Sequence, residues 1–178
     1  WSSTPCAGLV MMSERALARL EETTSDSFSA DLGKWRAIMA AYVGGGHAYH
    51  ATMPTDGLTA FRDTMAETRD YGFERLRDAQ WELGTKVRAA LRLRGIASVA
   101  AEGYGAPGVV VSYTDDPGVQ NGSKFGALGV QIAAGVPLQV GEPEGFSTFR
   151  LGLFGLDKLI DVDATVARLE AALDKAIG

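Results

Sequence analysis

The sequence has few of the residues that cross-link a chain or attach it to nucleic acid. Of its 178 residues only one is a cysteine, Cys6, so no internal disulfide can form and a reducing compartment, the cytoplasm, is the expected location. Lysine and arginine number 17 against 22 aspartates and glutamates, which gives a net charge of −5. Because a nucleic-acid-binding protein needs a basic surplus to neutralise phosphates, we expect no nucleic acid as a partner.

Long hydrophobic runs are also missing. Apolar runs such as Gly108 to Val111 are far shorter than the roughly 20 residues that cross a bilayer, so no membrane partner is expected. No secretory signal pattern is present. The chain begins with Trp1 instead of methionine, which indicates trimming, proteolysis or missing preceding residues. Hydrophobic residues still make up 46% of the chain, enough for a sizeable core.

Apolar periodicity predicts helices and strands in a definite order. The expected helices are residues 13–22, residues 32–43, one from Pro54 to a break at Gly72, one from Phe73 to about Leu91, residues 123–131, and one capped by Asp163. The expected strands are residues 7–12, 96–101, 108–114 and 148–154. From Gly72 onward this order predicts an α+β layer with helices packed on a small sheet.

Four patterns carry less chemistry than they suggest. Gly103 to Gly108 has the letters of a dinucleotide-binding loop, but strand residues follow it where such a site needs a helix. It is interpreted as a hairpin loop. His47 and His50 have no carboxylate or cysteine cluster around them, so a hydrogen-bonded loop pair is favoured over a metal pair. Cys6 is interpreted as a small buried thiol instead of a nucleophile.

The fourth pattern is a row of arginines on the helix after Gly72. They lie opposite its apolar residues and are interpreted as a solvated face; they are Arg75, Arg77, Arg88 and Arg92.

Two segments resemble class V aminotransferases, the group of alanine–glyoxylate and serine–pyruvate enzymes. The first is Tyr49 to Pro54, followed by a helix, and the second is Phe149 to Gly155, followed by a loop and the last helix. Residues 31–35 and 72–74 also look like family segments, and the order and spacing agree over essentially the whole chain.

The resemblance implies both a fold and a domain division. The chain is expected to be the C-terminal part of a fold-type-I transferase that uses pyridoxal 5'-phosphate, with α/β and α+β parts. Residues 1–70 would be the tail of the large cofactor-binding domain. Residues 71–178 would be a small α+β domain with a short sheet covered by helices.

The first segment offers two hydroxyl donors, Tyr49 and Thr52, on one loop before the helix that follows Pro54. The resemblance implies that they bind the cofactor phosphate of the neighbouring subunit, so that the protein is a homodimer with a shared cofactor site. Otherwise Tyr49 simply packs and Thr52 caps the helix.

The second segment centres on Arg150, between Phe149 and Leu151. A buried guanidinium needs a partner, and its planar fork matches a carboxylate. The resemblance implies that Arg150 binds the carboxylate of the amino-acid and 2-oxo-acid substrates, while Gly152 leaves room for close approach. The alternative is a structural salt bridge, for instance with Asp157.

No lysine of this chain has the setting of the family's Schiff-base lysine, which is expected shortly before Trp1. No catalytic residue is therefore assigned here, and the chain alone is expected to be inactive. The resemblance implies that the full-length parent transfers the amino group of alanine or serine to glyoxylate or pyruvate.

Two other functions stay open. One is a class V lyase or desulfurase, for which Cys6 lies in the wrong place. The other is a non-catalytic domain that binds a small carboxylate or mediates dimer contacts.

Overall fold

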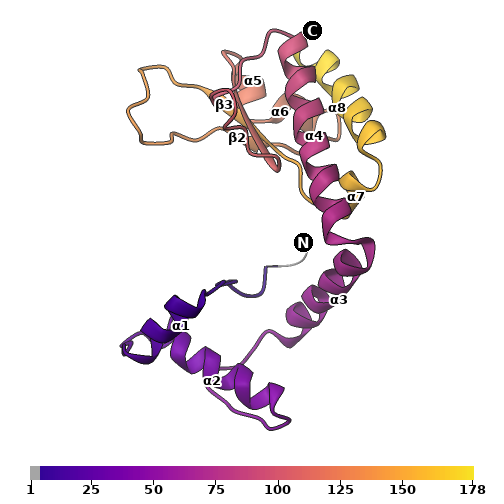
Figure 1. The fold of residues 1–178 in the computed structure, drawn as a ribbon. Coiled ribbons are helices and arrows are strands. Elements are labelled where there is room, and N and C mark those ends of the chain that lie inside the picture. The colour runs from indigo at the N-terminus through magenta and orange to yellow at the C-terminus, as the bar shows by residue number, and fades with distance from the viewer. Residues whose placement is uncertain (1–4) are drawn as a thin grey trace. The chain divides into compact units, whose positions relative to one another are not determined.

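The computed structural model describes residues 5–178, which form two compact units (Figure 1). The N-terminal unit comprises residues 5–62 and the C-terminal unit residues 63–178. Helix α3, Thr55–Tyr71, contains the point at which the units divide. Among the helices of residues 5–178, none has the length and hydropathy of a segment that crosses a membrane.

The N-terminal unit contains the first two helices, α1 (Glu14–Glu21) and α2 (Leu32–Val43). Each begins after a side-chain cap that accepts a hydrogen bond from a free amide of the first turn, at 3.3 Å for Ser13 and 3.0 Å for Asp31. Helix α2 ends at Gly44, where the glycine run begins. Both helices were predicted from the sequence and are confirmed.

The strand predicted over Ala7 to Met12 is wrong. These residues have no regular structure, and Leu9, Val10 and Met11 are exposed. The apolar run resembles a buried strand in composition, but a strand needs a neighbour with which to share backbone hydrogen bonds. Residues 5–62 contain no strand.

The C-terminal unit is a small sheet with two long helices packed together along one side. Helix α4 (Phe73–Leu93) begins after Gly72, whose φ of 104° breaks the preceding helix as expected. It packs against α8, and ion pairs from Arg94 join the two helices. The remaining helices are α5 (Pro117–Gln120), α6 (Ser123–Gly126), α7 (Leu156–Leu159) and α8 (Val162–Ile177).

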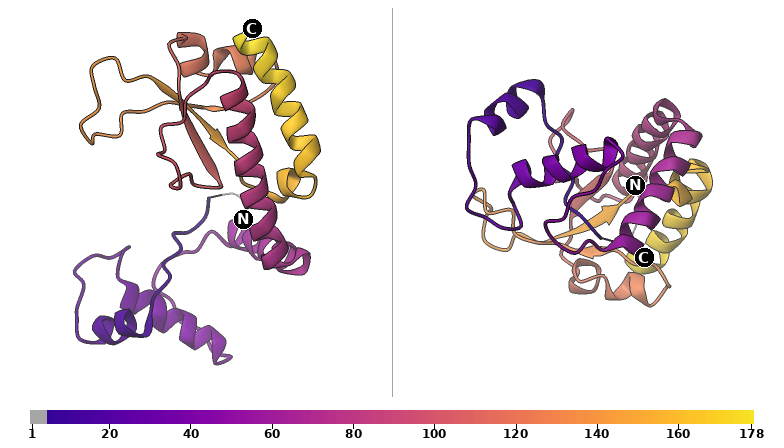
Figure 2. Two further views of the ribbon diagram at one scale, coloured as in Figure 1. Left: turned by 45° about the horizontal axis from the view of Figure 1, so that its top comes forward. Right: turned by 90° about the horizontal axis from the view of Figure 1, so that it is seen from below.

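The sheet is antiparallel, with the order β1-β3-β2. Its strands are β1 (Val109–Tyr113), β2 (Ala133–Ala134) and β3 (Thr148–Gly152). Because successive side chains point to opposite faces of a strand, one face of the sheet joins the core while the other does not. The core side chains of the sheet are Val110, Phe149 and Leu151, and they pack with Leu83, Val87, Leu91 and Leu173 of α4 and α8. Figure 2 shows these two helices on one side and the connection between β2 and β3 extending away from them.

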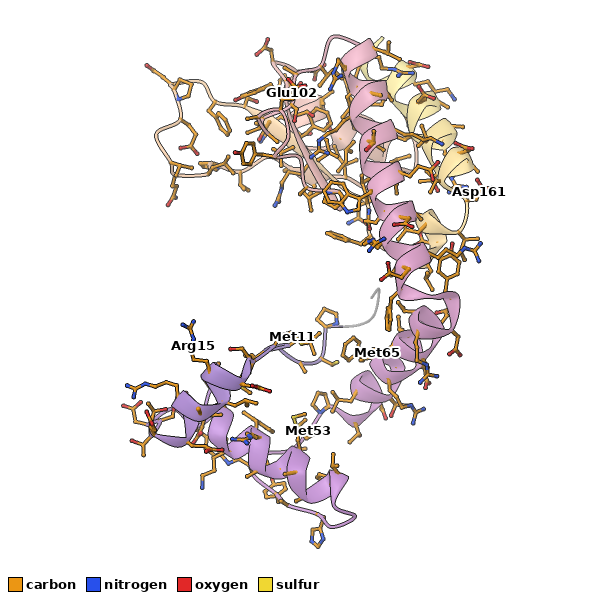
Figure 3. The ribbon with its side chains drawn as sticks, in the orientation of Figure 1. Met11, Arg15, Met53, Met65, Glu102 and Asp161 are labelled. Atoms are coloured by element: carbon orange, nitrogen blue, oxygen red, sulfur yellow. The ribbon has the colours of Figure 1, made fainter. Side chains whose placement is uncertain are left out.

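Three sequence predictions need correction in the C-terminal unit. Residues 96–101 form no strand of their own but one isolated bridge, between Ser98 and Ser112. The helix predicted over residues 123–131 is only the single turn of α6. The last helix is capped by Asp161, labelled in Figure 3, and not by Asp163, because the Asp161 carboxylate accepts the Ala164 amide at 2.9 Å.

Candidate functional site

Arg150 lies in the middle of β3, on the face of the sheet turned away from the core. Its neighbours Phe149 and Leu151 point the other way and are buried. Arg150 itself is half-buried, so the expectation of a guanidinium buried among apolar residues is corrected. The apolar neighbours suggested burial, but the alternation of an antiparallel strand places them and Arg150 on opposite faces.

The guanidinium is held by the backbone of the neighbouring strand β2. Arg150 Nε donates to the carbonyl oxygen of Ala134 at 2.9 Å. The segment after β2 is fixed close to β3 at Gly135, where a Cβ would lie only 1.8 Å from the Thr148 carbonyl oxygen. Gln120 of α5 also bonds to Gly135, accepting from its amide at 3.3 Å and donating to its carbonyl at 3.3 Å. These contacts fix the carbonyl that orients Arg150.

The terminal nitrogens of Arg150 are not used inside the part of the chain that the structure describes. No hydrogen bond or ion pair of Nη1 or Nη2 is found within residues 5–178. The suggested partner Asp157 pairs with Lys158 instead, at 3.0 Å. Since these two nitrogens form the fork that matches a carboxylate, the side chain is oriented but has capacity for a ligand.

Tyr49 and Thr52 lie together on the loop that leads into α3. Their hydroxyl oxygens are 3.3 Å apart, and the Tyr49 side chain is 79% exposed. Met53, labelled in Figure 3, marks the position of this loop in the N-terminal unit. One of these hydroxyls donates to the other, and both can turn to donate to the oxygens of a phosphate. The packed Tyr49 considered as an alternative is not observed.

The same loop is held in place by His50. Its Nε2 lies 2.8 Å from the Phe28 carbonyl oxygen, and its ring contacts those of Phe28 and Trp35, with centroids 4.3 Å and 5.2 Å away. Within residues 5–178, no three histidine, cysteine or acidic side chains gather as a metal site would require. The interpretation as a hydrogen-bonded loop residue agrees with this geometry for His50, whereas His47 is exposed.

The lysines of the chain are surface residues. Lys86 binds Asp163 and Glu82, and these hydrogen bonds raise the pKa of its ammonium to about 12. A Schiff-base lysine needs the opposite shift, because only the neutral amine attacks a carbonyl. Lys124 and Lys158 are also ion-paired with carboxylates, and Lys34 and Lys175 are exposed on α2 and α8. None of these side chains has the sheltered setting that the chemistry needs.

The other two discounted motifs were the glycine loop before β1 and Cys6, which was predicted to be buried. No helix begins between Gly103 and Gly108, and β1 starts directly afterwards, so the dinucleotide pattern is a loop. Cys6 is a free, half-buried thiol that packs beside Gly57, where an added Cβ would lie 2.8 Å from the Cys6 Cβ.

The solvated arginine face is wrong at one position. Arg77 pairs with Glu74 at 2.7 Å and is exposed, as expected, but Arg88 is half-buried and its Nε is sealed from solvent without a hydrogen-bond partner. Helical spacing alone could not reveal this, because the residues that cover Arg88 belong to the loop before β1.

Comparison with models of protein families and with curated proteins gives no match. Solved structures do match. An alanine–glyoxylate aminotransferase from Nostoc sp. has a TM-score of 0.70 at 19% identity, over 94% of this chain and 42% of that one. A ureidoglycine–glyoxylate aminotransferase from Bacillus subtilis has a TM-score of 0.62 at 18% identity, over 93% of this chain and 42% of that one. An aspartate aminotransferase from Thermus thermophilus has a TM-score of 0.58 at 16% identity, over 93% and 43%.

The chain thus spans about two fifths of the length of the structures that it matches. Its mostly helical architecture with a small antiparallel sheet is the one predicted from the resemblance. The chain shares its fold with the C-terminal part of these aminotransferase structures.

Proposed function

We propose that this chain is the C-terminal part of an aminotransferase that uses pyridoxal 5'-phosphate. The reaction would move an amino group from a small amino acid, alanine or serine, to a 2-oxo acid, glyoxylate or pyruvate. The observation that carries the proposal is Arg150, oriented by Ala134 on an open face of the sheet with both terminal nitrogens available. Two of the three structures described above are named for glyoxylate as a substrate, which supports an oxo acid of this size.

Arg150 would bind the carboxylate that both substrates share. The fork of Nη1 and Nη2 can donate two parallel hydrogen bonds, each contributing about 1.5–3 kcal/mol because both groups are charged. Since Nε is already fixed by a backbone carbonyl, little rotamer freedom is lost when the acid binds. One contact would therefore orient the amino donor and the oxo acceptor in turn.

Tyr49 and Thr52 would donate their hydroxyls to the cofactor phosphate. Their oxygens lie 3.3 Å apart on one exposed loop, which suits two oxygens of one phosphate group. By the family's pattern this phosphate belongs to the neighbouring subunit, so the active protein would be a homodimer. When bound, the cofactor supplies an electron sink for the bonds broken at the substrate's α-carbon.

The lysine that holds the cofactor and moves the proton would come from the polypeptide that precedes Trp1. Residues 1–70 would then complete the large domain, and residues 71–178 would form the small domain. Apolar side chains left exposed in the N-terminal unit support a further covering surface; they include Met11, Tyr42 and Val43. The unpaired Cys6 suits a cytoplasmic protein.

The test uses the full-length protein, meaning this chain together with the segment encoded before Trp1. Purified protein is mixed with pyridoxal phosphate, its visible absorption is recorded, and transfer from alanine or serine to glyoxylate or pyruvate is measured. We expect a visible absorption band that saturates as pyridoxal phosphate is added. We also expect one molecule of a new amino acid for each molecule of 2-oxo acid consumed. A band with cleavage of the amino acid instead of transfer would favour a lyase. The absence of any band would leave a carboxylate-binding domain and reject the proposal.

A further inference from the structure

A cavity lies in the C-terminal unit, between the last turns of α4, the loop before β1 and β1 itself. Its volume is about 400 Å³, within the range of small-molecule sites. The loop is held in place by the sheet, because Val99 donates to the Val111 carbonyl and Tyr113 to the Ala97 carbonyl, both at 3.0 Å. The polar side chains that line the cavity are Arg88, Arg92, Ser98, Glu102 and Ser112.

Two of these side chains carry buried polar atoms that have no partner. Ser112 is 1% exposed, and its hydroxyl makes no hydrogen bond. The Nε atom of Arg88 is also buried and makes no hydrogen bond. They are the unpaired buried side-chain atoms found within residues 5–178. Both atoms are closed to a water-sized probe as the side chains stand, so the guanidinium and the hydroxyl must turn toward the cavity to reach an acceptor there. A buried donor without an acceptor costs about 1–3 kcal/mol, and pairing with an acceptor in the cavity would favour that turn.

Neighbouring backbone keeps the Arg88 guanidinium beside the cavity. Its Nη2 donates to the Val109 carbonyl at 3.2 Å, and Gly105 lies so close that an added Cβ would be 2.6 Å from Nε. Burial lowers the pKa of this arginine from its ordinary value, and no carboxylate is paired with it among the described residues. Buried cations in folded proteins are usually paired with an anion, so a half-buried arginine without one is unusual.

The charge of the lining favours an anion. The charged side chains that line the cavity are Arg88, Arg92 and Glu102, which together give a net charge of +1. Glu102 is exposed, in the connection between α4 and β1, and is labelled in Figure 3. Water alone could satisfy the two donors but would leave the arginine charge without a counter-ion.

We propose that this cavity binds the carboxylate or phosphate group of a small molecule, with Arg88 and Ser112 as its buried donors and Arg92 as a cation at its margin. Binding here requires neither pyridoxal phosphate nor Arg150. Carboxylates and phosphates both present negatively charged oxygens that accept hydrogen bonds, and the experiment distinguishes the two groups.

The experiment follows nuclear magnetic resonance signals of the isotope-labelled 178-residue chain during two titrations. One uses sodium phosphate and the other sodium acetate, each with chloride adjusted to constant ionic strength. The Ser112 amide and the Arg88 Nε–H are the signals of interest. We expect saturable shifts with at least one probe, and the probe that binds more tightly identifies the class of acid.

Three variants and one control assign the binding to the cavity. Arg88→Gln removes the charge, whereas Gly105→Ala keeps it but pushes the guanidinium aside, since the atom that its Cβ would meet belongs to a flexible side chain. Each should weaken binding about tenfold or more, the effect of one charge-assisted hydrogen bond. Ser112→Ala should weaken binding without lowering the melting temperature, because the hydroxyl has no internal partner to lose. Arg77→Gln, on the same helix and outside the cavity, should leave the affinity unchanged.

Three results would overturn the proposal. If neither probe gives a saturable shift, the cavity holds water only. If Arg77→Gln weakens binding as much as Arg88→Gln, the probes respond to net charge instead of to the cavity. If Ser112→Ala lowers the melting temperature, its hydroxyl has a structural partner and the reasoning about unpaired donors fails.

Discussion

Gly135 is the residue on which the orientation of Arg150 depends, and Gly135→Ala tests this. An added Cβ would lie 1.8 Å from the carbonyl oxygen of Thr148, where ordinary contacts begin at 3.4 Å. The backbone must therefore move by roughly 1.6 Å, the difference between these distances. A shift of that size breaks the 2.9 Å bond between Arg150 and Ala134 and the pairing of β2 with β3.

Gly135→Ala should lose stability both from overpacking and from the loss of hydrogen bonds between β2 and β3. Strain from an inserted methyl group costs about 1–3 kcal/mol, and each backbone hydrogen bond lost adds about 1 kcal/mol. We expect Gly135→Ala to lower the free energy of unfolding by about 2–5 kcal/mol, measured by urea unfolding and circular dichroism.

Gly126→Ala is the matched control. That glycine is helical, with no atom within 4 Å of an added Cβ, so the free energy of unfolding should stay the same or rise by up to about 0.5 kcal/mol. If Gly135→Ala is as stable as the parent chain, the close approach of β2 to β3 does not exist and the orientation of Arg150 has another cause.

Three further predictions concern the core, a helix cap and the cofactor loop. Leu173→Ala should destabilise the C-terminal unit by about 2–5 kcal/mol in the same unfolding assay, because this core side chain is fully buried; a smaller loss would mean that α8 is loosely packed. Asp116 binds Lys124 and caps α5, and these bonds hold the pKa of its carboxyl below its ordinary value of 3.8. A carboxyl whose pKa is lowered by folding stabilises the fold at pH values above 3.8, and this contribution is lost as the pH falls through the lowered pKa. The melting temperatures of Asp116→Asn and the parent chain should therefore differ at neutral pH and converge in acid. A constant difference would show that the charge is irrelevant. Tyr49→Phe should weaken pyridoxal phosphate binding by the full-length protein about 10- to 100-fold without changing its melting temperature, since the lost hydroxyl is exposed; equal affinities in an absorption titration would exclude Tyr49 from the phosphate site.

The long helices could be predicted from the sequence because several signals agree in each. In α2, an apolar stripe and a following glycine run predicted both bounds, and the structure adds a side-chain cap at Asp31. The shorter elements have too few residues to show a helical or strand periodicity, so they could not be predicted. The two residues of β2, both exposed, carry no alternation, and α5 and α7 are single turns. The apolar run before Met12 shows the opposite error, since composition suggests a strand but only a neighbouring strand can make one.

The candidate site divides in the same way. The sequence predicted that Tyr49 and Thr52 share a loop, and their hydroxyls are indeed adjacent. The half-exposed face of Arg150 was missed because its strand neighbours are apolar, although strand alternation would have placed it opposite them. Its bond to Ala134 and the cover of Arg88 by Gly105 were beyond reach, because both join segments far apart along the chain.

The carboxylate role of Arg150 is tested most directly by Arg150→Lys in the full-length protein. An ammonium cannot reproduce the two-pronged fork, so the KM of both the amino acid and the 2-oxo acid should rise about tenfold or more. Visible absorption by bound cofactor should stay the same, and Arg168→Lys on α8, whose guanidinium bonds to Thr165, should leave both KM values unchanged. Unaltered KM values for both acids in Arg150→Lys would contradict the account.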